Sequence, residues 1–286
     1  MVRDSECPRT FYCLFYSYAL FTANLAAESV AITELRVPST VPNGTKGVVL
    51  DCMYNIKENE TAGLVITWYF NDSPTPSYQW IPDQAPRSLG PLRKRIQLDY
   101  AVTNNPLTKH RALYIIQPTI ELTGNFKCVV STYKDEDFMF KRMIVYAADK
   151  NMQLYRSISN RPSKVNISCS ADAVFPMPVL RLFRVIEGED GKPRNDSLMI
   201  DQVDYQIKGA YYITVYTMIP ETQLPSKTMF YCELEIPYTP YRNAKKFFYN
   251  PGNSESLQVE NLTSRNQFSK TIVWTMLLAR LYFTLF

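Results

Sequence analysis

Histidine is the residue that this sequence most nearly lacks. Its 286 residues include one, His110. A Ser-His-Asp triad needs a histidine base, and most catalytic zinc sites need several histidine ligands. In the strand-like segment 110–116, His110 has the opposite parity to Leu113 and Ile115, so we expect an ordinary outward-facing side chain.

Glycine is scarce too, and the nine glycines are scattered. Phosphate loops and dinucleotide fingerprints need glycines in clusters. No two cysteines have the CxxC spacing of redox motifs. The net charge of +4 is small for this length and gives no reason to expect nucleic acid. We therefore expect no cofactor, and a binding protein rather than an enzyme.

Long helical periodicity is missing as well. Short alternating runs recur instead, for example at 63–70, 138–147 and 210–219, with Pro, Gly, Asn and Asp between them. The 20 tyrosines and 15 phenylalanines also suit strands. Many short alternating strands predict an all-β fold made of sandwiches.

Residues 1–27 have the pattern of a secretory signal peptide. An apolar run from Phe11 to Ala23 follows a short charged region, and Ala26 and Ala27 offer a cleavage site. The run is shorter than the roughly 20 residues that span a bilayer. Cleavage is therefore favoured over an uncleaved membrane anchor.

An exported chain keeps four of the six cysteines, because Cys7 and Cys13 lie in the leader. An even number in an extracellular protein predicts disulfides. The four are Cys52, Cys128, Cys169 and Cys232. Six glycosylation sequons agree with export. They begin at Asn43, Asn59, Asn71, Asn166, Asn195 and Asn261. The Asn71 sequon is the weakest, because Pro74 follows its serine.

The C-terminal end carries a second signal. Residues 271–286 are apolar up to the last residue, and a polar linker or spacer, 248–270, precedes them. A polar spacer and a terminal apolar tail are typical of the signal that is exchanged for a GPI anchor. The alternative is a short single-pass helix. We expect membrane attachment through the C-terminus at the extracellular face of the plasma membrane, with secretion as the alternative.

The middle of the chain contains one pattern twice. Apolar residues alternate up to Cys52 and Cys169, and around Cys128 and Cys232. Each half therefore has two strands that turn a cysteine toward a core. The predicted domains are residues 31–147 and 150–247.

The order Cys52, Trp68 and Gly124-x-Phe126-x-Cys128 resembles an immunoglobulin domain. In that fold the two cysteines bridge two sheets and the tryptophan packs on the bridge. The resemblance implies a Cys52–Cys128 disulfide, with Trp68 and Phe126 in the core. The wide spacing of this pair leaves room for extra strands, which indicates a V-type domain.

The second half resembles a divergent immunoglobulin domain of C-like spacing. Cys169 and Cys232 are its pair, Leu182 stands at the tryptophan position, and Phe230 takes the place of Phe126. The resemblance therefore implies two tandem immunoglobulin-like β-sandwiches, the first V-type and the second divergent and C-like.

The first half departs from the usual pattern at two positions. Phe126 replaces the usual tyrosine, so the tyrosine-corner hydrogen bond is expected to be absent. Leu122 replaces a common aspartate, so the salt bridge that is usual near that turn lacks its acidic residue.

A more particular resemblance is to the Beaten path family of insect cell-surface proteins. It rests on the stretches Trp68-Tyr69, Tyr78–Pro82, Pro86, Ile96-x-Leu98-Asp99, 123–131 and 175–183. Family members have two immunoglobulin domains, bind Sidestep-family receptors, and guide axons or match synaptic partners. The resemblance implies a recognition or adhesion protein of this kind. The alternative is a secreted module that binds a soluble ligand or a glycan.

With Trp68 and Cys128 inward, the alternate residues of their strands point outward. The predicted outward positions are Val65, Thr67, Tyr69, Lys127, Val129 and Ser131, with one or both of Tyr78 and Trp80. Phe138 or Phe140 extends this face. An exposed apolar face with Tyr and Trp anchors is typical of a protein interface. We predict partner binding here, and the alternatives are a homodimer or packing on the second domain.

A basic run, Arg93-Lys94-Arg95, has two interpretations. It is either a heparan sulfate site or a solvated edge before a strand.

Overall fold

The structure is a computed structural model whose described residues are 30–158, 163–187, 193–251 and 260–261. The predicted signal peptide (1–27), the apolar tail (271–286) and most of the spacer 248–270 lie outside the described residues. Within the described ranges, no helix is long and apolar enough to cross a membrane.

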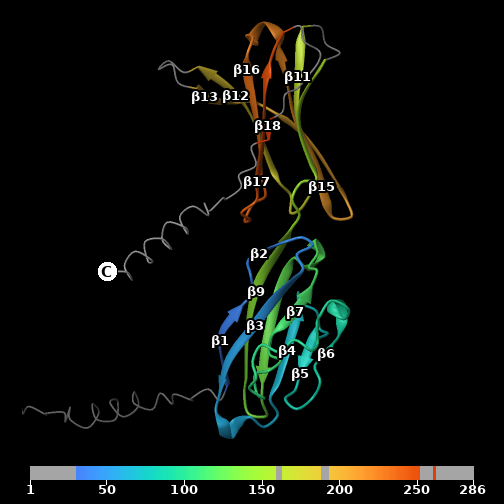
Figure 1. Cartoon of the computed structure of the whole chain (residues 1–286), viewed down its shortest axis with the longest axis vertical. Helices are drawn as coiled ribbons and strands as arrows, with labels where there is room; N and C mark the ends of the chain where they lie inside the picture. Colours follow the sequence, from blue (N-terminus) through green and yellow to red (C-terminus); the bar gives the residue numbers. More distant parts are fainter. Residues whose placement is uncertain (1–29, 159–162, 188–192, 252–259, 262–286) are drawn as a thin grey trace, which may run out of the picture.

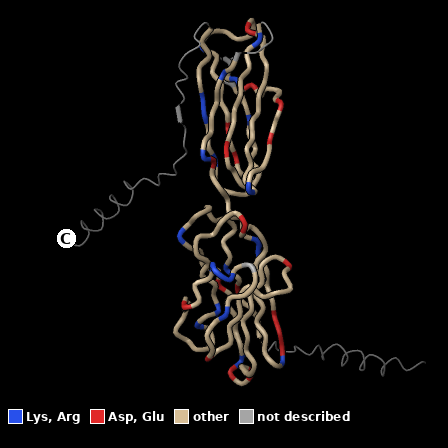
Figure 2. The backbone as a smooth tube through the Cα atoms, turned by 90° about the vertical axis from the view of Figure 1, so that its right-hand side faces the viewer, with Lys and Arg blue, Asp and Glu red and all other residues tan. Residues whose placement is uncertain are grey.

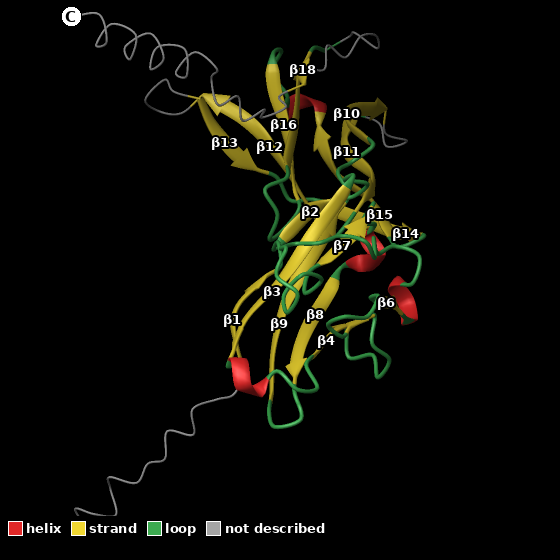
Figure 3. Ribbon diagram, turned by 60° about the horizontal axis from the view of Figure 1, so that its bottom comes forward, coloured by secondary structure: helices red, strands yellow, loops and turns green. Residues whose placement is uncertain are grey.

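Two β-sandwiches follow one another along the long axis of the molecule (Figure 1). Apart from strands, the described chain contains short 3-10 turns (Figure 3). These turns are η1 (Glu58–Glu60), η2 (Gly90–Leu92), η3 (Ile120–Leu122) and η4 (Glu221–Gln223). The structure thus confirms the predicted all-β fold with two tandem sandwiches.

Domain 1 has a three-stranded sheet, β1-β3-β7, facing a six-stranded sheet, β2-β9-β8-β4-β5-β6. Its strands are β1 (Val30–Arg36), β2 (Thr40–Pro42), β3 (Gly47–Ile56), β4 (Val65–Phe70), β5 (Tyr78–Trp80), β6 (Arg87–Ser88), β7 (Leu113–Ile116), β8 (Gly124–Ser131) and β9 (Glu136–Tyr146). Strands β5 and β6 extend the sheet beyond β4, as in V-type domains. Strand β2 pairs in parallel with the end of β9.

Domain 2 has sheets β10-β11-β15-β14 and β13-β12-β16-β17-β18. Its strands are β10 (Asn151–Ile158), β11 (Lys164–Val174), β12 (Val179–Glu187), β13 (Pro193–Ser197), β14 (Asp201–Ile207), β15 (Ala210–Pro220), β16 (Thr228–Glu235), β17 (Arg242–Tyr249) and β18 (Glu260–Asn261). The first sheet has the four-strand order of a constant-type domain, which agrees with the predicted C-like class.

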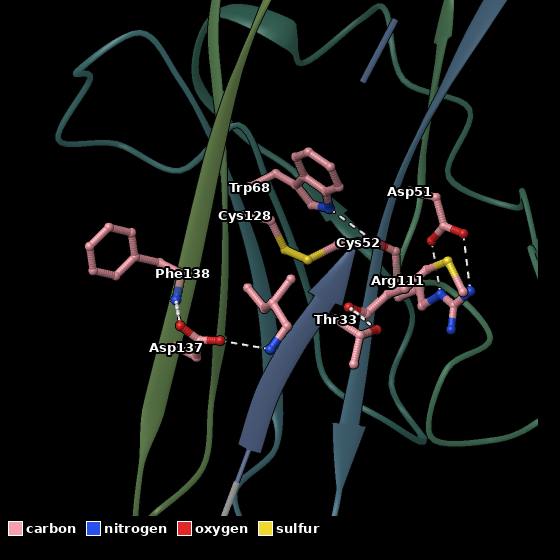
Figure 4. Close-up of a disulfide and its surroundings, with 10 residues drawn as sticks. Thr33, Asp51, Cys52, Trp68, Arg111, Cys128, Asp137 and Phe138 are labelled. Atoms are coloured by element: carbon pink, nitrogen blue, oxygen red, sulfur yellow. Dashed lines mark hydrogen bonds and ion pairs between the residues drawn. A yellow bond between two sulfur atoms is a disulfide. The ribbon is translucent and has the colours of Figure 1, made fainter. Parts of the chain in front are cut away.

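One disulfide crosses each sandwich. The Cys52–Cys128 bond joins β3 to β8, and the Cys169–Cys232 bond joins β11 to β16, each with its Cα atoms 6.4 Å apart. Trp68 is fully buried beside the first bond (Figure 4). These are the pairs that the immunoglobulin resemblance implied. The core residues Phe126, Leu182 and Phe230 are buried as well.

The segment that leads into β7 is bound to the core of domain 1 by aromatic side chains. The Trp68 indole N–H donates to the carbonyl of Arg111 at 3.0 Å, and the Tyr78 hydroxyl donates to the carbonyl of His110 at 2.7 Å. The Arg111 guanidinium forms two hydrogen bonds with the Asp51 carboxylate, at 2.8 and 3.0 Å, next to Cys52 (Figure 4). These contacts fix the segment before β7 against the core next to Trp68.

His110 lies in this segment, before β7 begins, and it is half buried. Its Nδ1 is 2.7 Å from the carbonyl oxygen of Tyr100. The prediction of an outward strand histidine is therefore wrong, because the strand begins three residues later. Within the described residues, no group of three or more His, Cys, Asp or Glu side chains is placed to hold a metal ion.

The turn before β8 replaces the usual salt bridge with a shifted one. Arg95 donates to the Glu121 carboxylate at 2.9 Å and to the Thr119 hydroxyl at 2.5 Å. The acidic partner thus stands one residue before Leu122, which is buried. Phe126, at the position of the usual tyrosine, is fully buried and packs on Phe70 with ring centroids 4.9 Å apart.

The junction between the domains is built around Asp149. Its carboxylate accepts hydrogen bonds from the Tyr241 hydroxyl at 2.5 Å and the Asn243 amide at 3.0 Å. Burial, and then the Asp149 carboxylate, raise the pKa of the Tyr241 hydroxyl. Ala147 and Phe175 exchange backbone hydrogen bonds of 2.8 and 3.1 Å. The end of β9 is thereby joined to domain 2.

We predict that Cys128→Ser prevents normal secretion. The disulfide closes a separation of 76 residues, and in the chain-entropy model this stabilises the folded state by about 4 kcal/mol. The measurements are the secreted fraction and the thermal unfolding midpoint. Ser131→Ala, a half-exposed position on the same strand, is the control. Normal secretion with an unchanged midpoint for Cys128→Ser would refute this role of the bond.

Candidate protein interaction face

Strands β4, β8 and β9 carry the predicted interaction face on the side away from the core. In antiparallel strands, residues directly opposite each other point to the same side of the sheet. The registers therefore place the outward residues in three rows. The rows are Val65–Ser131–Glu136, Thr67–Val129–Phe138 and Tyr69–Lys127–Phe140. We call these positions the β4–β8–β9 face.

Both phenylalanines of β9 point outward. Phe138 is 50% exposed and Phe140 is 69% exposed. The Lys127 ammonium lies 4.2 Å from the centroid of the Phe138 ring, a cation–π contact. Tyr69 and Lys127 are half buried. The sequence left the parity of these two phenylalanines open, and the structure places both on the β4–β8–β9 face.

Asp137 explains the orientation of this part of β9. Its carboxylate accepts the backbone N–H of Ile32 in β1 at 2.6 Å and that of Phe138 at 2.7 Å (Figure 4). Because Asp137 turns toward β1, its neighbour Phe138 points away from the sandwich. Figure 4 shows Phe138 directed away from the disulfide.

The middle row is less accessible than parity suggests. Thr67 and Val129 have the predicted outward orientation but are 6% and 8% exposed. They are short side chains in the middle of the sheet, between the longer Phe138, Tyr69 and Lys127. Their inclusion among the contact residues is therefore corrected, because they support the face from below.

Tyr78 and Trp80 are not part of the face. They lie opposite Trp68 and Ile66, which face the core, and they are 1% and 2% exposed. Burial also raises the pKa of the Tyr78 hydroxyl. The outward residue of β5 is Gln79, opposite Thr67. The Tyr-Gln-Trp alternation already contained this signal, because two large apolar residues flank one polar residue.

A hollow of about 450 Å³ opens in the face beside the turn between β4 and β5. Its lining residues are Tyr69, Asn71, Asp72, Ser73, Asn125, Lys127, Phe138 and Phe140. Sequence reasoning missed this hollow, because it depends on how the turn folds against β8.

The face does not pack on the described part of domain 2, because Phe138 and Phe140 stay exposed with both domains present. Packing of the face against the described part of domain 2 is therefore excluded as an alternative. Basic and acidic residues are interspersed along the backbone of both domains (Figure 2). The face itself combines two exposed phenylalanines with Lys127 and Glu136.

The basic run does not present three equivalent cations. Arg93 and Lys94 are exposed, whereas Arg95 is partly buried and holds Thr119 and Glu121. The run lies in the turn that directly follows η2, with two side chains in solvent. This geometry matches the solvated-edge interpretation better than the heparan sulfate interpretation.

The sequons lie in different environments. Asn43, Asn59, Asn71 and Asn195 are exposed, whereas Asn166 is half buried in β11 and donates to the Ser157 hydroxyl at 3.2 Å. Asn261 lies in β18, and its side chain is outside what the structure describes. None of the six asparagines occupies a position in the three rows, and Asn71 lines the hollow.

Solved structures share this architecture. Bovine butyrophilin aligns with a TM-score of 0.58 and 12% identity, over 77% of this chain and 97% of its own. Rst D1-D2 aligns with a TM-score of 0.51 and 14% identity, over 78% of this chain and 99% of its own. The mouse nectin-like molecule 4 ectodomain aligns with a TM-score of 0.47 and 14% identity, over 74% and 65%.

The first two similarities show that the chain has the fold of two tandem immunoglobulin domains. No model of a known protein family matches the sequence. No curated protein matches it either. At 12 to 14% identity, the fold is what the solved structures establish.

We predict that two neighbouring substitutions in β5 differ strongly in their effect on the stability of domain 1. Trp80→Ala should destabilise domain 1 by about 3–5 kcal/mol, because it removes a buried indole from a packed core. Gln79→Ala should leave the stability nearly unchanged, because that side chain faces outward. Denaturant unfolding of both variants measures this. Similar small losses for both would place Trp80 outside the core.

Proposed function

We propose that this protein is a cell-surface recognition or adhesion protein that binds another immunoglobulin-superfamily receptor through the β4–β8–β9 face. The observation that carries the proposal is the exposure of Phe138 and Phe140, side by side with Lys127 and Tyr69 on a regular sheet. Burial of large apolar side chains from water is the main source of affinity in protein interfaces.

The composition of the face favours a protein partner. Aromatic residues are enriched in the centres of protein interfaces, where they are surrounded by polar groups. Here the two phenylalanines lie next to Lys127 and Tyr69, with Glu136 and Ser131 along the margin. A regular sheet also holds these side chains in place before binding, which lowers the entropy cost of association.

Resemblance supports a more specific version of the proposal. The stretches shared with the Beaten path family favour a Sidestep-like receptor as partner and a role in axon guidance or synaptic partner matching. Tyr78 and Trp80 are core residues, so the shared Tyr78–Pro82 stretch supports a shared fold rather than a shared contact surface. The exposed positions, above all Phe138 and Phe140, are the ones expected to select the partner.

The location at the membrane is part of the proposal. The leader and the sequons favour export, and the spacer with its apolar tail favours a GPI anchor. The alternative function, a secreted immunoglobulin module for a soluble ligand or glycan, differs in having no attachment. The alternative partner is a second copy of this chain, bound through the same face.

We predict that Phe140→Arg and Tyr69→Arg each abolish binding in a screen against immunoglobulin-family ectodomains. A charge placed among the aromatic side chains would have to lose its water in the complex. Phe248→Arg is the matched control, because Phe248 is 56% exposed on a strand of domain 2. All three proteins should be secreted and should melt normally.

The binding assay distinguishes three outcomes. Loss in the first two variants with normal binding by Phe248→Arg supports the face. Unchanged binding by both Phe140→Arg and Tyr69→Arg places the contact elsewhere. If the only protein bound is this chain itself, the partner is a second copy.

We predict that phosphatidylinositol-specific phospholipase releases the protein from expressing cells. A GPI anchor contains the bond that this enzyme cleaves, whereas a spanning helix does not. Release is measured by cell-surface staining and by recovery in the medium. Protein that stays on treated cells indicates a spanning helix. Protein found in the medium without treatment indicates the secreted alternative.

A further inference from the structure

We infer that the hollow beside the β4–β5 turn is the seat of an N-glycan on Asn71. The first sugar packs on the aromatic side chains that line the hollow. Its presence then controls how much of the β4–β8–β9 face a partner reaches. The packing stands on its own observations, whereas the control of access rests on the proposed function.

Asn71 is held in an orientation that suits the modification. It directly follows β4, with a backbone φ of 47°. Its N–H donates to the Asn125 carbonyl at 2.8 Å, and its Oδ1 accepts the Asn125 N–H at 3.0 Å. A glycan replaces a hydrogen on Nδ2, so Oδ1 keeps its role as acceptor. The amide is therefore already oriented, with Oδ1 against β8.

The lining of the hollow suits a sugar. Tyr69 stands two residues before Asn71, and both residues line the hollow. Phe140 lies in the row of Tyr69, and Phe138 lies in the next row. The C–H face of a pyranose packs on aromatic rings, and Asp72 and Ser73 line the hollow beside them. The volume of about 450 Å³ is in the range of small-molecule sites.

The sequon itself indicates two forms of the protein. Pro74 follows Asn71-Asp72-Ser73, and proline after the hydroxyl residue reduces transfer of the glycan. Partial occupancy would produce one form with the hollow filled and one with it open. The open form leaves Phe140 and Tyr69 accessible to a protein partner.

The first experiment tests the packing. The full chain is expressed in cells that glycosylate, and occupancy at Asn71 is measured by peptide mass spectrometry. Ser73→Ala removes the glycan but keeps the Asn71 amide, and Pro74→Ala raises occupancy. The glycosylated form should melt higher than Ser73→Ala by roughly 2 °C or more. In a Phe140→Ser background, this difference should shrink to what the Ser73 hydroxyl contributes through its hydrogen bonds with Thr75.

A second sequon provides the matched control. Thr61→Ala removes the glycan of Asn59, which is exposed in η1 and lies outside the hollow. Its effect on the melting temperature should be the same with Phe140 and with Ser at that position. The packing is overturned if Asn71 carries no glycan in either the native or the Pro74→Ala protein. It is also overturned if the effect of Ser73→Ala does not depend on Phe140.

The second experiment tests control of access. Affinity for the ectodomain recovered in the screen should rise roughly threefold or more in Ser73→Ala and fall in Pro74→Ala. Equal affinity of both variants and the native protein overturns the control of access. If Tyr69→Arg and Phe140→Arg leave binding unchanged, the proposed function fails. The melting measurements still decide whether the glycan occupies the hollow.

Discussion

The Cys52–Cys128 disulfide is the constraint on which the description of domain 1 depends. A strand alternates its side chains, so a cysteine that must reach the opposite sheet sets the direction of every other residue in its strand. Cys128 and Phe126 face the core, and Lys127 and Val129 therefore face away from it. A shift of one residue in β8 would exchange the two sets.

The neighbouring strands inherit this orientation through their registers. Trp68 of β4 lies opposite Cys128 of β8, and Phe138 of β9 lies opposite Val129 of β8. Asp137 adds a second constraint by bonding to β1, so the exposed phenylalanines are not an accident of a loose edge strand. The geometry of the face is therefore a consequence of core packing.

Much of this was visible in the sequence because two-residue alternation and cysteine placement are local signals. The sandwich class, the buried Trp68 and the outward direction of Tyr69 follow from them. The phase of β5 follows from alternation too, because Gln79 stands between two large apolar residues, and the prediction that Tyr78 or Trp80 faces outward is wrong.

The alternation of side chains along a strand predicts which way each side chain points, but it does not predict how exposed that side chain is. Thr67 and Val129 point outward and are still covered by longer neighbours. The Arg95–Glu121 ion pair and the hollow likewise depend on how separate segments meet in space, which no local pattern reports. Side-chain oxidation by hydroxyl radicals, with and without the receptor ectodomain, tests the account most directly. Protection of Phe138, Phe140 and Tyr69 with unchanged labelling of Phe248 is the predicted result, and protection confined to domain 2 would contradict it.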